Sequence, residues 1–167
     1  MNAPRPLTET QLRVMKPLVM LFSRLHVWLF KRSGGRRFNR MGGGEVCVVR
    51  MTGAKSGAVR EFPLMCIPHG DDILLVASFA GAPRHPVWYH NLVRHPRVEI
   101  LTGGQSRAMT ARLAGADEKA ALWPVCCASY PDFARWPVCC ASYPDFARYQ
   151  QRTVRDIPVF VCEAART

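Results

Sequence analysis

The chain has 167 residues, of which 49% are hydrophobic, and its formal net charge at pH 7 is +11. This length suits one domain with a core large enough to fold without disulfide or metal support, and the hydrophobic content excludes a disordered chain. No stretch of about 18 unbroken apolar residues is present, so we expect no transmembrane span. The N-terminus also lacks the charged-then-apolar pattern of a secretory signal.

The positive charge is concentrated near the N-terminus. Residues 1–40 hold nine Lys or Arg and a single acid, Glu9, so they carry +8 of the total. Anionic partners are therefore expected at this arm first, and the candidates are nucleic acid, a membrane surface and an anionic cofactor. Nucleic acid is disfavoured because the basic residues are not interleaved with a recognisable reading motif.

The first predicted element is an amphipathic helix over residues 17–32. Pro17 suits the first turn of a helix, and the sequence Arg-Ser-Gly-Gly at 32–35 ends it. Such a helix can cap the folded domain, or it can lie on an anionic membrane surface. The apolar residues at helical spacing are Leu18, Leu21, Phe22, Leu25, Trp28 and Leu29.

The centre of the chain predicts a series of short strands separated by Gly or Pro. The β-rich runs are residues 46–51, 62–67, 73–78, 98–101, 107–113 and 157–162. They predict an α+β fold, mainly antiparallel β, in the form of a small barrel. Flanking helices are expected at 17–32, near 86–95 and from 117 onward, where Asp117 and Glu118 place acids in the first helical turn.

A tandem duplication interrupts the third predicted helix. Residues 123–135 and 136–148 share the sequence WPVCCASYPDFAR. The repeat is too short and too perfect for a solenoid, so we interpret it as a recent insertion or a sequence artefact. Thirteen residues turn a helix by about 220° beyond whole turns, and the prolines oppose one continuous helix. We expect one copy, or a hybrid, to take the native place and the surplus to bulge out.

The seven cysteines include four from this duplication. They form no CxxC pair and have no zinc-ligand spacing. We therefore expect reduced, mostly buried thiols in a cytosolic protein. His85 and His90 have no third ligand at a sensible spacing, so no metal site is predicted.

Two segments carry candidate chemistry, and the first is TGAKSGAVR at residues 52–60. It places Lys55, Ser56 and Arg60 on a glycine-containing loop between two predicted strands. A point charge, a hydroxyl and a guanidinium fork suit a phosphate group. A solvated basic hairpin would show the same pattern, and the loop lacks the spacing of a Walker motif.

The second segment is SFAGAPRHPVWYHNL at residues 78–92. A strand end leads through small residues into an aromatic helix start, and such a loop can lie flat against a ring. Trp88 could pack on that ring and Asn91 could hydrogen-bond it. As an alternative, Trp88 and Tyr89 are core residues, which is where aromatic side chains usually lie.

Together these residues resemble the deazaflavin-dependent nitroreductase family of actinobacteria. The resemblance spans about residues 17–163, and it rests on GAKSG at 53–57 with Arg60, on HPVWYHNL at 85–92, on YPDF at 143–146 and on IPV at 157–159. It implies a split β-barrel like that of FMN-binding pyridoxamine-phosphate oxidases. It also implies coenzyme F-420 (8-hydroxy-5-deazaflavin) as the hydride donor. We accordingly expect a basic arm over residues 1–40 and a split-barrel cofactor domain over residues 41–167.

The resemblance also implies functional residues. The positions that match cofactor contacts are Lys55, Ser56, Gly57, Arg60, Pro63, Ser78, Val87, Trp88 and Asn91. The positions that match the acceptor pocket are Ser78, Tyr143 and Tyr149, with Tyr130 if the first copy of the duplication is used.

The chain departs from the family pattern at two of its positions. Ala54 stands where the family often has Arg, which removes one cationic contact to a polyanionic cofactor. Phe146 replaces the middle of three pocket tyrosines. The lost hydroxyl puts nitroimidazole reduction in doubt and leaves quinone reduction open.

The expected activity is hydride transfer from reduced F-420 to a quinone-like or nitroaromatic acceptor. The alternatives are a split-barrel reductase that uses FMN and a non-catalytic module that binds a cofactor or a membrane. We expect a cytoplasmic protein, with peripheral attachment to the inner face of the plasma membrane through the N-terminal helix, because members of the family are thought to act on membrane quinones. No nucleic-acid partner is expected.

Overall fold

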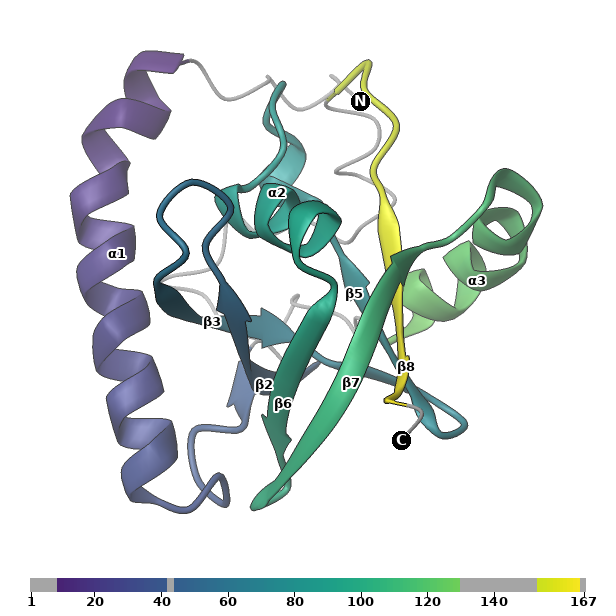
Figure 1. The fold of residues 1–167 in the computed structure, drawn as a ribbon. Coiled ribbons are helices and arrows are strands. Elements are labelled where there is room, and N and C mark those ends of the chain that lie inside the picture. Colours follow the sequence, from purple (N-terminus) through teal and green to yellow (C-terminus); the bar gives the residue numbers. More distant parts are fainter. Residues whose placement is uncertain (1–8, 42–43, 130–152, 166–167) are drawn as a thin grey trace.

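The computed structural model describes residues 9–41, 44–129 and 153–165. Within these ranges three helices and a short 3-10 turn surround eight strands (Figure 1). The helical elements are α1 (Glu9–Arg32), η1 (Phe79–Gly81), α2 (Val87–Arg94) and α3 (Ala116–Ala128). The strands are β1 (Arg40–Met41), β2 (Gly44–Thr52), β3 (Val59–Met65), β4 (Ile67–His69), β5 (Asp72–Val76), β6 (Arg97–Thr102), β7 (Gln105–Leu113) and β8 (Val159–Ala164).

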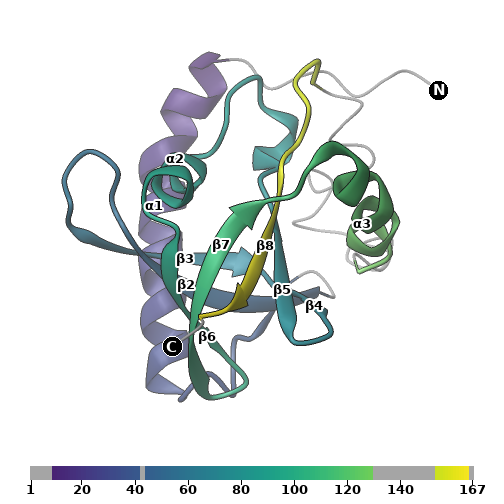
Figure 2. The same cartoon turned by 45° about the vertical axis from the view of Figure 1, so that its right-hand side comes forward.

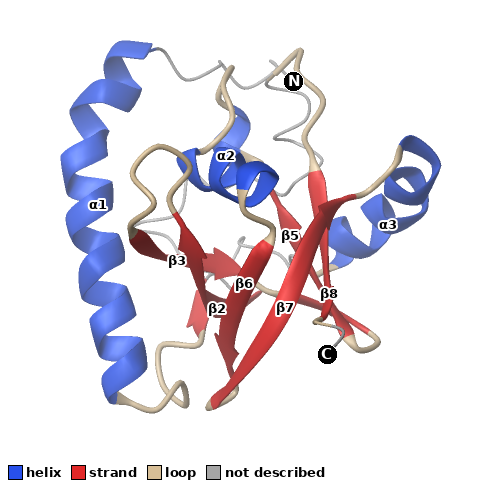
Figure 3. Ribbon diagram, in the orientation of Figure 1, coloured by secondary structure: helices blue, strands red, loops and turns tan. Residues whose placement is uncertain are grey.

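The strands form one curled antiparallel sheet (Figure 3). Its order is β1-β2-β6-β7-β8-β5-β4, and β3 pairs separately with β2. The last strand of the chain, β8, inserts between β5 and β7 and so joins the two halves. The predicted α+β class with a mainly antiparallel split barrel is therefore confirmed, as are the three helix positions.

The central strands are buried on both faces, which explains their continuous apolar runs. In β2, Cys47 and Val49 point into the main core, whereas Val48 packs beneath α1 against Val27 and Phe30. In β5 the inward residues join the same core, while Leu74 and Val76 pack beneath α3. Figure 2 shows α1 and α3 on different sides of the sheet.

The first helix is longer than predicted, and its apolar face is not buried. It begins at Glu9, so Pro17 lies inside the helix and not in its first turn. A narrow stripe with His26, Val27 and Phe30 packs on the barrel. The predicted apolar row is exposed at Leu18, Leu21, Phe22, Leu25 and Trp28, with Trp28 56% exposed. The helix therefore does cap the barrel, but it packs through a different face from the predicted apolar row.

Several strand boundaries differ from prediction. The predicted strand 62–67 is two strands, because the chain leaves β2 at Met65 and pairs with β5 from Ile67. Between them, Cys66 donates its backbone N–H to the carbonyl of Glu45 at 2.9 Å. The predicted strand 73–78 ends at Val76, and the last strand begins at Val159, two residues later than expected.

The described cysteines agree with the expectation of reduced, mostly buried thiols. Cys47, Cys66, Cys126 and Cys162 are buried and Cys127 is half-buried, and no disulfide joins any two of these five described cysteines. Burial raises the pKa of the Cys162 thiol to about 12. A hydrogen bond to Cys66, together with burial, holds the pKa of Cys47 well above its usual range.

The duplication lies mostly outside the described residues. Its first seven residues, 123–129, are described, and α3 runs through Pro124 before ending at Ala128. The expected bulge and the three expected pocket tyrosines, Tyr130, Tyr143 and Tyr149, fall in residues 130–152, outside the described ranges. In the part of the chain that is described, no helix is long and apolar enough to cross a membrane.

Candidate functional site

The Lys/Arg loop is the tip of the β2–β3 hairpin. Strand pairing ends at Thr52 and Val59, and the Gly53 and Ala58 backbones then close the turn with a 2.9 Å hydrogen bond. Gly57 has φ +64°, in the left-handed region that favours glycine. A Cβ on Gly53 would lie 3.0 Å from the Ser56 hydroxyl and 3.1 Å from the Ala58 carbonyl oxygen, so a side chain here would force these neighbours to shift by a few tenths of an ångström.

One polar side chain of this hairpin hydrogen-bonds within the turn, and two basic side chains are exposed to solvent. The hydroxyl of Ser56 accepts a hydrogen bond from the backbone N–H of Ala58 at 3.3 Å. Lys55 and Arg60 are exposed, so their charges are accessible to an anion. Pro63 lies further along β3, half-buried opposite Val48.

Asn91 of α2 joins this hairpin to the rest of the site. Its side chain is 4% exposed, and its Oδ1 accepts the backbone N–H of Ala54 at 2.9 Å. Its Nδ2 lies 3.6 Å from the sulfur of Met51. The predicted cofactor contact therefore has a structural task in this protein, which is to fix the base of the Lys55 turn against α2.

The other predicted residues of α2 lie on different faces of the helix, one buried and one exposed. Trp88 is buried in the main core, and its ring centroid lies 5.9 Å from that of Phe160. Trp88 is therefore packed as a core residue, which was the alternative interpretation of this position. Val87 is 65% exposed at the first position of the helix. Tyr89 stacks on His85, with centroids 4.1 Å apart and planes 15° from parallel.

The loop between β5 and α2 carries Ser78, the residue expected in both the cofactor and acceptor sites. Ser78 precedes η1, and its side chain makes no capping hydrogen bond to that turn. Phe79 has φ +46° and Gly81 has φ +73°. A non-glycine residue in this region is uncommon and indicates a constrained backbone.

Sequence reasoning missed Arg155, which contacts this loop from the segment before β8. Its Nη2 donates to the carbonyls of Ala77 and Ser78 at 3.0 and 2.7 Å. Its Nε donates to the carbonyl of Ala82 at 2.9 Å, and its Nη1 lies 3.3 Å from Nδ1 of His85. Burial, followed by the positive charges of Arg155 and His90, lowers the pKa of His85.

The predicted residues therefore form two groups joined by one hydrogen bond. The hairpin supplies Lys55, Ser56, Gly57, Arg60 and Pro63, and the loop and helix that follow β5 supply Ser78, Val87, Trp88 and Asn91. The bond from Ala54 to Asn91 connects the groups. Two exposed cations beside a glycine turn fit a phosphate-bearing, polyanionic cofactor.

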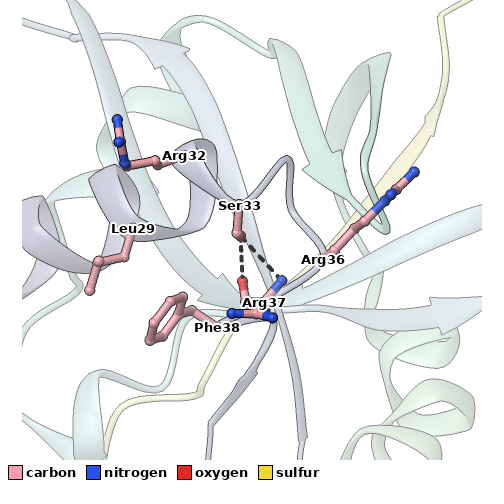
Figure 4. Close-up of a pocket in the computed structure, with 6 residues that line it drawn as sticks. All are labelled: Leu29, Arg32, Ser33, Arg36, Arg37 and Phe38. Atoms are coloured by element: carbon pink, nitrogen blue, oxygen red, sulfur yellow. Dashed lines mark hydrogen bonds between the residues drawn. The ribbon is translucent and has the colours of Figure 1, made fainter.

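A separate basic cavity of about 360 Å³ lies at the C-terminal end of α1 (Figure 4). Ser33 holds its wall in place, because its hydroxyl accepts the backbone N–H of Arg37 at 3.1 Å and lies within donating distance of the carbonyls of Phe30 and Arg37, at 2.8 and 3.0 Å. The lining residues are Leu29, Arg32, Ser33, Arg36, Arg37 and Phe38. None of the expected cofactor residues lines this cavity.

Comparisons with known proteins point to one family. The family model described as F-420H(2)-dependent quinone reductase matches residues 22–136. An F-420H(2)-dependent quinone reductase of Mycobacterium tuberculosis is 35% identical over 141 residues, which cover 83% of this chain and 87% of that protein.

Two solved structures are similar. One is an F-420-H2 dependent reductase (FDR-A), with 34% identity, a TM-score of 0.59, and coverage of 71% of this chain and 93% of that one. The other is described as a domain-swapped dimer, with 29% identity, a TM-score of 0.61, and coverage of 88% and 99%. With the split barrel and the basic hairpin in place, these matches show that the chain belongs to the F-420H(2)-dependent quinone reductase family, oxidoreductases whose cofactor is coenzyme F-420.

Proposed function

We propose that this protein holds reduced F-420 on the β2–β3 hairpin and transfers hydride from it to a quinone-like acceptor beside Ser78. The observation that supports this most directly is the exposed pair Lys55 and Arg60 on a turn that Asn91 fixes to α2. A turn that is already anchored presents its charges to an anion without a large ordering cost.

Each group of residues has a distinct task in this proposal. Lys55 and Arg60 neutralise the cofactor's phosphate and acidic tail, and the Ser56 and Gly57 backbone approaches the phosphate closely. The bound deazaflavin supplies a two-electron hydride donor, so the protein need only orient it and exclude water. Val87, at the exposed start of α2, and Pro63 would wall the ring.

The acceptor side is proposed to use hydroxyl groups. The Ser78 side chain, which makes no capping bond in η1, would donate a hydrogen bond to the acceptor oxygen as hydride arrives. Tyr143 and Tyr149, or Tyr130 from the first copy, would supply further hydroxyls. Because Phe146 stands in place of the middle tyrosine, we expect quinones to be reduced faster than nitroaromatic compounds.

The cofactor role is tested by removing each hairpin cation. Lys55→Ala and Arg60→Ala should each weaken F-420 binding by about 1.5–3 kcal/mol, the range for charged hydrogen bonds, which is about 10- to 150-fold in Kd. Fluorescence titration measures this affinity. The matched control is Arg112→Ala, a surface arginine paired with Glu118 and Glu163, and it should bind F-420 as the parent does. Unchanged affinity in both hairpin variants would show that the loop is only a solvated turn.

We also propose that α1 attaches the protein peripherally to the anionic inner face of the plasma membrane. In this view residues 1–40 form the attachment arm and residues 41–167 the cofactor domain. The exposed row from Leu18 to Trp28 would enter the interface. Charge complementarity supports the same partner, because Arg32 lies 5.7 Å over the Trp28 ring and lines the basic cavity beside it.

Vesicle sedimentation tests this attachment. The parent should bind vesicles that contain phosphatidylserine, with binding that weakens as salt rises, and it should not bind neutral vesicles. Leu25→Ser with Trp28→Ser should abolish binding, whereas Val154→Ser, at an exposed apolar side chain elsewhere, should not. Equal binding to neutral and anionic vesicles would contradict the proposal. A concentration-dependent dimer that the double variant dissociates would show instead that a second copy covers the row.

A further inference from the structure

The loop from Ala77 to Ala82 has a backbone conformation that needs outside support. Phe79 has φ +46°, in the left-handed region, which is unfavourable for a bulky residue. Within the loop, η1 supplies two backbone hydrogen bonds, from Gly81 to Ser78 and from Ala82 to Phe79, both 3.0 Å long. Strained backbone of this kind persists where the surrounding structure fixes it.

Outside support comes from a backbone hydrogen bond of Ala77 to the carbonyl of Pro158, 2.9 Å long, and from one side chain more than seventy residues away in the sequence. The Arg155 guanidinium binds the carbonyls of Ala77 and Ser78 at the start of the loop and that of Ala82 at its end. A planar fork with several fixed donors can bridge both ends at once, whereas the point charge of a lysine cannot. The fork thus closes the loop across the strained residue.

The same guanidinium also orients His85. Because Nη1 of Arg155 donates, Nδ1 of His85 must accept, which leaves the proton of the neutral ring on Nε2. The ring oriented in this way stacks on Tyr89 at the start of α2. One side chain therefore joins the loop with Ser78 to the helix with Val87 and Asn91.

We propose that Arg155 is a positioning residue for hydride transfer, because it clamps the Ala77–Ala82 loop and so sets where Ser78 meets the acceptor. The reaction part of this inference rests on the proposed function, whereas the clamp itself is a property of the protein without cofactor. A displacement of Ser78 by about 1 Å is enough to cost about 100-fold in rate. Arg155 acts through the backbone of the loop, so its loss should change turnover more than cofactor affinity.

The test compares Arg155→Gln and Arg155→Lys with the matched control Arg112→Gln. Arg112 also makes several side-chain hydrogen bonds, to Glu118 and Glu163, but it lies on the strand pair β7–β8 and is exposed. In the absence of cofactor, hydrogen exchange at the Gly81 and Ala82 amides should rise at least 10-fold in both Arg155 variants and stay unchanged in the control. With F-420 and a soluble quinone, kcat should fall about 10- to 100-fold while the Kd of F-420 stays within about 3-fold.

A rescue experiment distinguishes positioning from general damage. Arg155→Ala should regain part of its kcat when millimolar guanidinium ion is added, and Arg112→Ala should not respond. Unchanged exchange at Gly81 and Ala82 would overturn the clamp. Faster exchange with parental kcat would overturn the positioning role, and so would a lower kcat that guanidinium does not restore in a folded variant. If the parent itself bound no F-420, the proposed function would fail, while hydrogen exchange would still decide the clamp.

Discussion

Replacing Asn91 tests whether its amide anchors the hairpin or contacts the cofactor. Asn91→Leu keeps the side-chain volume and removes the acceptor for the Ala54 backbone N–H, which in the parent donates a 2.9 Å hydrogen bond to the buried Asn91 side chain. An unsatisfied buried donor costs about 1–3 kcal/mol. For a protein of this length each kcal/mol lowers Tm by about 2–4 °C, so the expected loss is about 2–12 °C.

The assay is urea and thermal denaturation of the protein without cofactor, followed by F-420 titration. The matched control is Gln105→Leu, which replaces an exposed amide at the first residue of β7, where the free energy of unfolding should change by less than about 0.5 kcal/mol. We expect Asn91→Leu to be less stable without cofactor and to bind F-420 more weakly, because Lys55 and Arg60 are then held less firmly. Parental stability combined with weaker F-420 binding would refute the anchor and show that Asn91 contacts the cofactor directly.

Three further outcomes are expected. The pKa of His85 is lowered in the folded protein, so the folded protein binds fewer protons than the unfolded chain as pH falls through about 6.5. The free energy of unfolding should therefore decline on acidification through that range. Urea titrations at about pH 5–8 should show a smaller decline for His85→Gln. Among the described residues, Nε2 of His26 is buried without a hydrogen-bond partner, so His26→Leu should raise the free energy of unfolding by about 1 kcal/mol; a clear loss would reveal a partner such as water. Deleting residues 136–148 removes one copy of the duplication and should leave F-420 affinity within a few-fold and preserve or raise quinone turnover; failure to fold would mean that both copies belong to the native structure.

Local signals in the sequence were sufficient for most of the fold. The apolar runs around Val48 and Leu74 predicted strands because these strands are buried on both faces, and α2 followed from the aromatic start at Trp88. The break at Cys66 was not predictable, because it depends on which neighbour each half pairs with. The orientation of α1 was missed because the helix packs through a stripe with His26, and hydropathy does not rank histidine as a core residue.

The candidate site was also predictable only in part. The Lys55 hairpin was predictable, because a glycine-containing segment with lysine and serine between two apolar strands indicates a turn with exposed charge. The role of Arg155 was not predictable, because its partners are backbone carbonyls 73 to 78 residues away in the sequence. Every residue has a backbone carbonyl, so the residue types give no indication of this contact. Asn91 was recognised as important, but the partner expected for its amide was a ring, whereas the structure gives it Ala54.

The reaction rate of the thiols buried inside the barrel can be used to measure how often the folded protein opens. Alkylating and disulfide reagents attack the thiolate, and a pKa of about 12 leaves Cys162 almost wholly protonated at neutral pH. Cys47 is equally inaccessible, in a strand that pairs on both sides. Modification of these two sulfurs therefore requires the sheet to open, so their labelling rate in native buffer measures how often β2 and β8 separate from their own neighbouring strands. The half-buried Cys127 of α3 reports only on motions at the periphery.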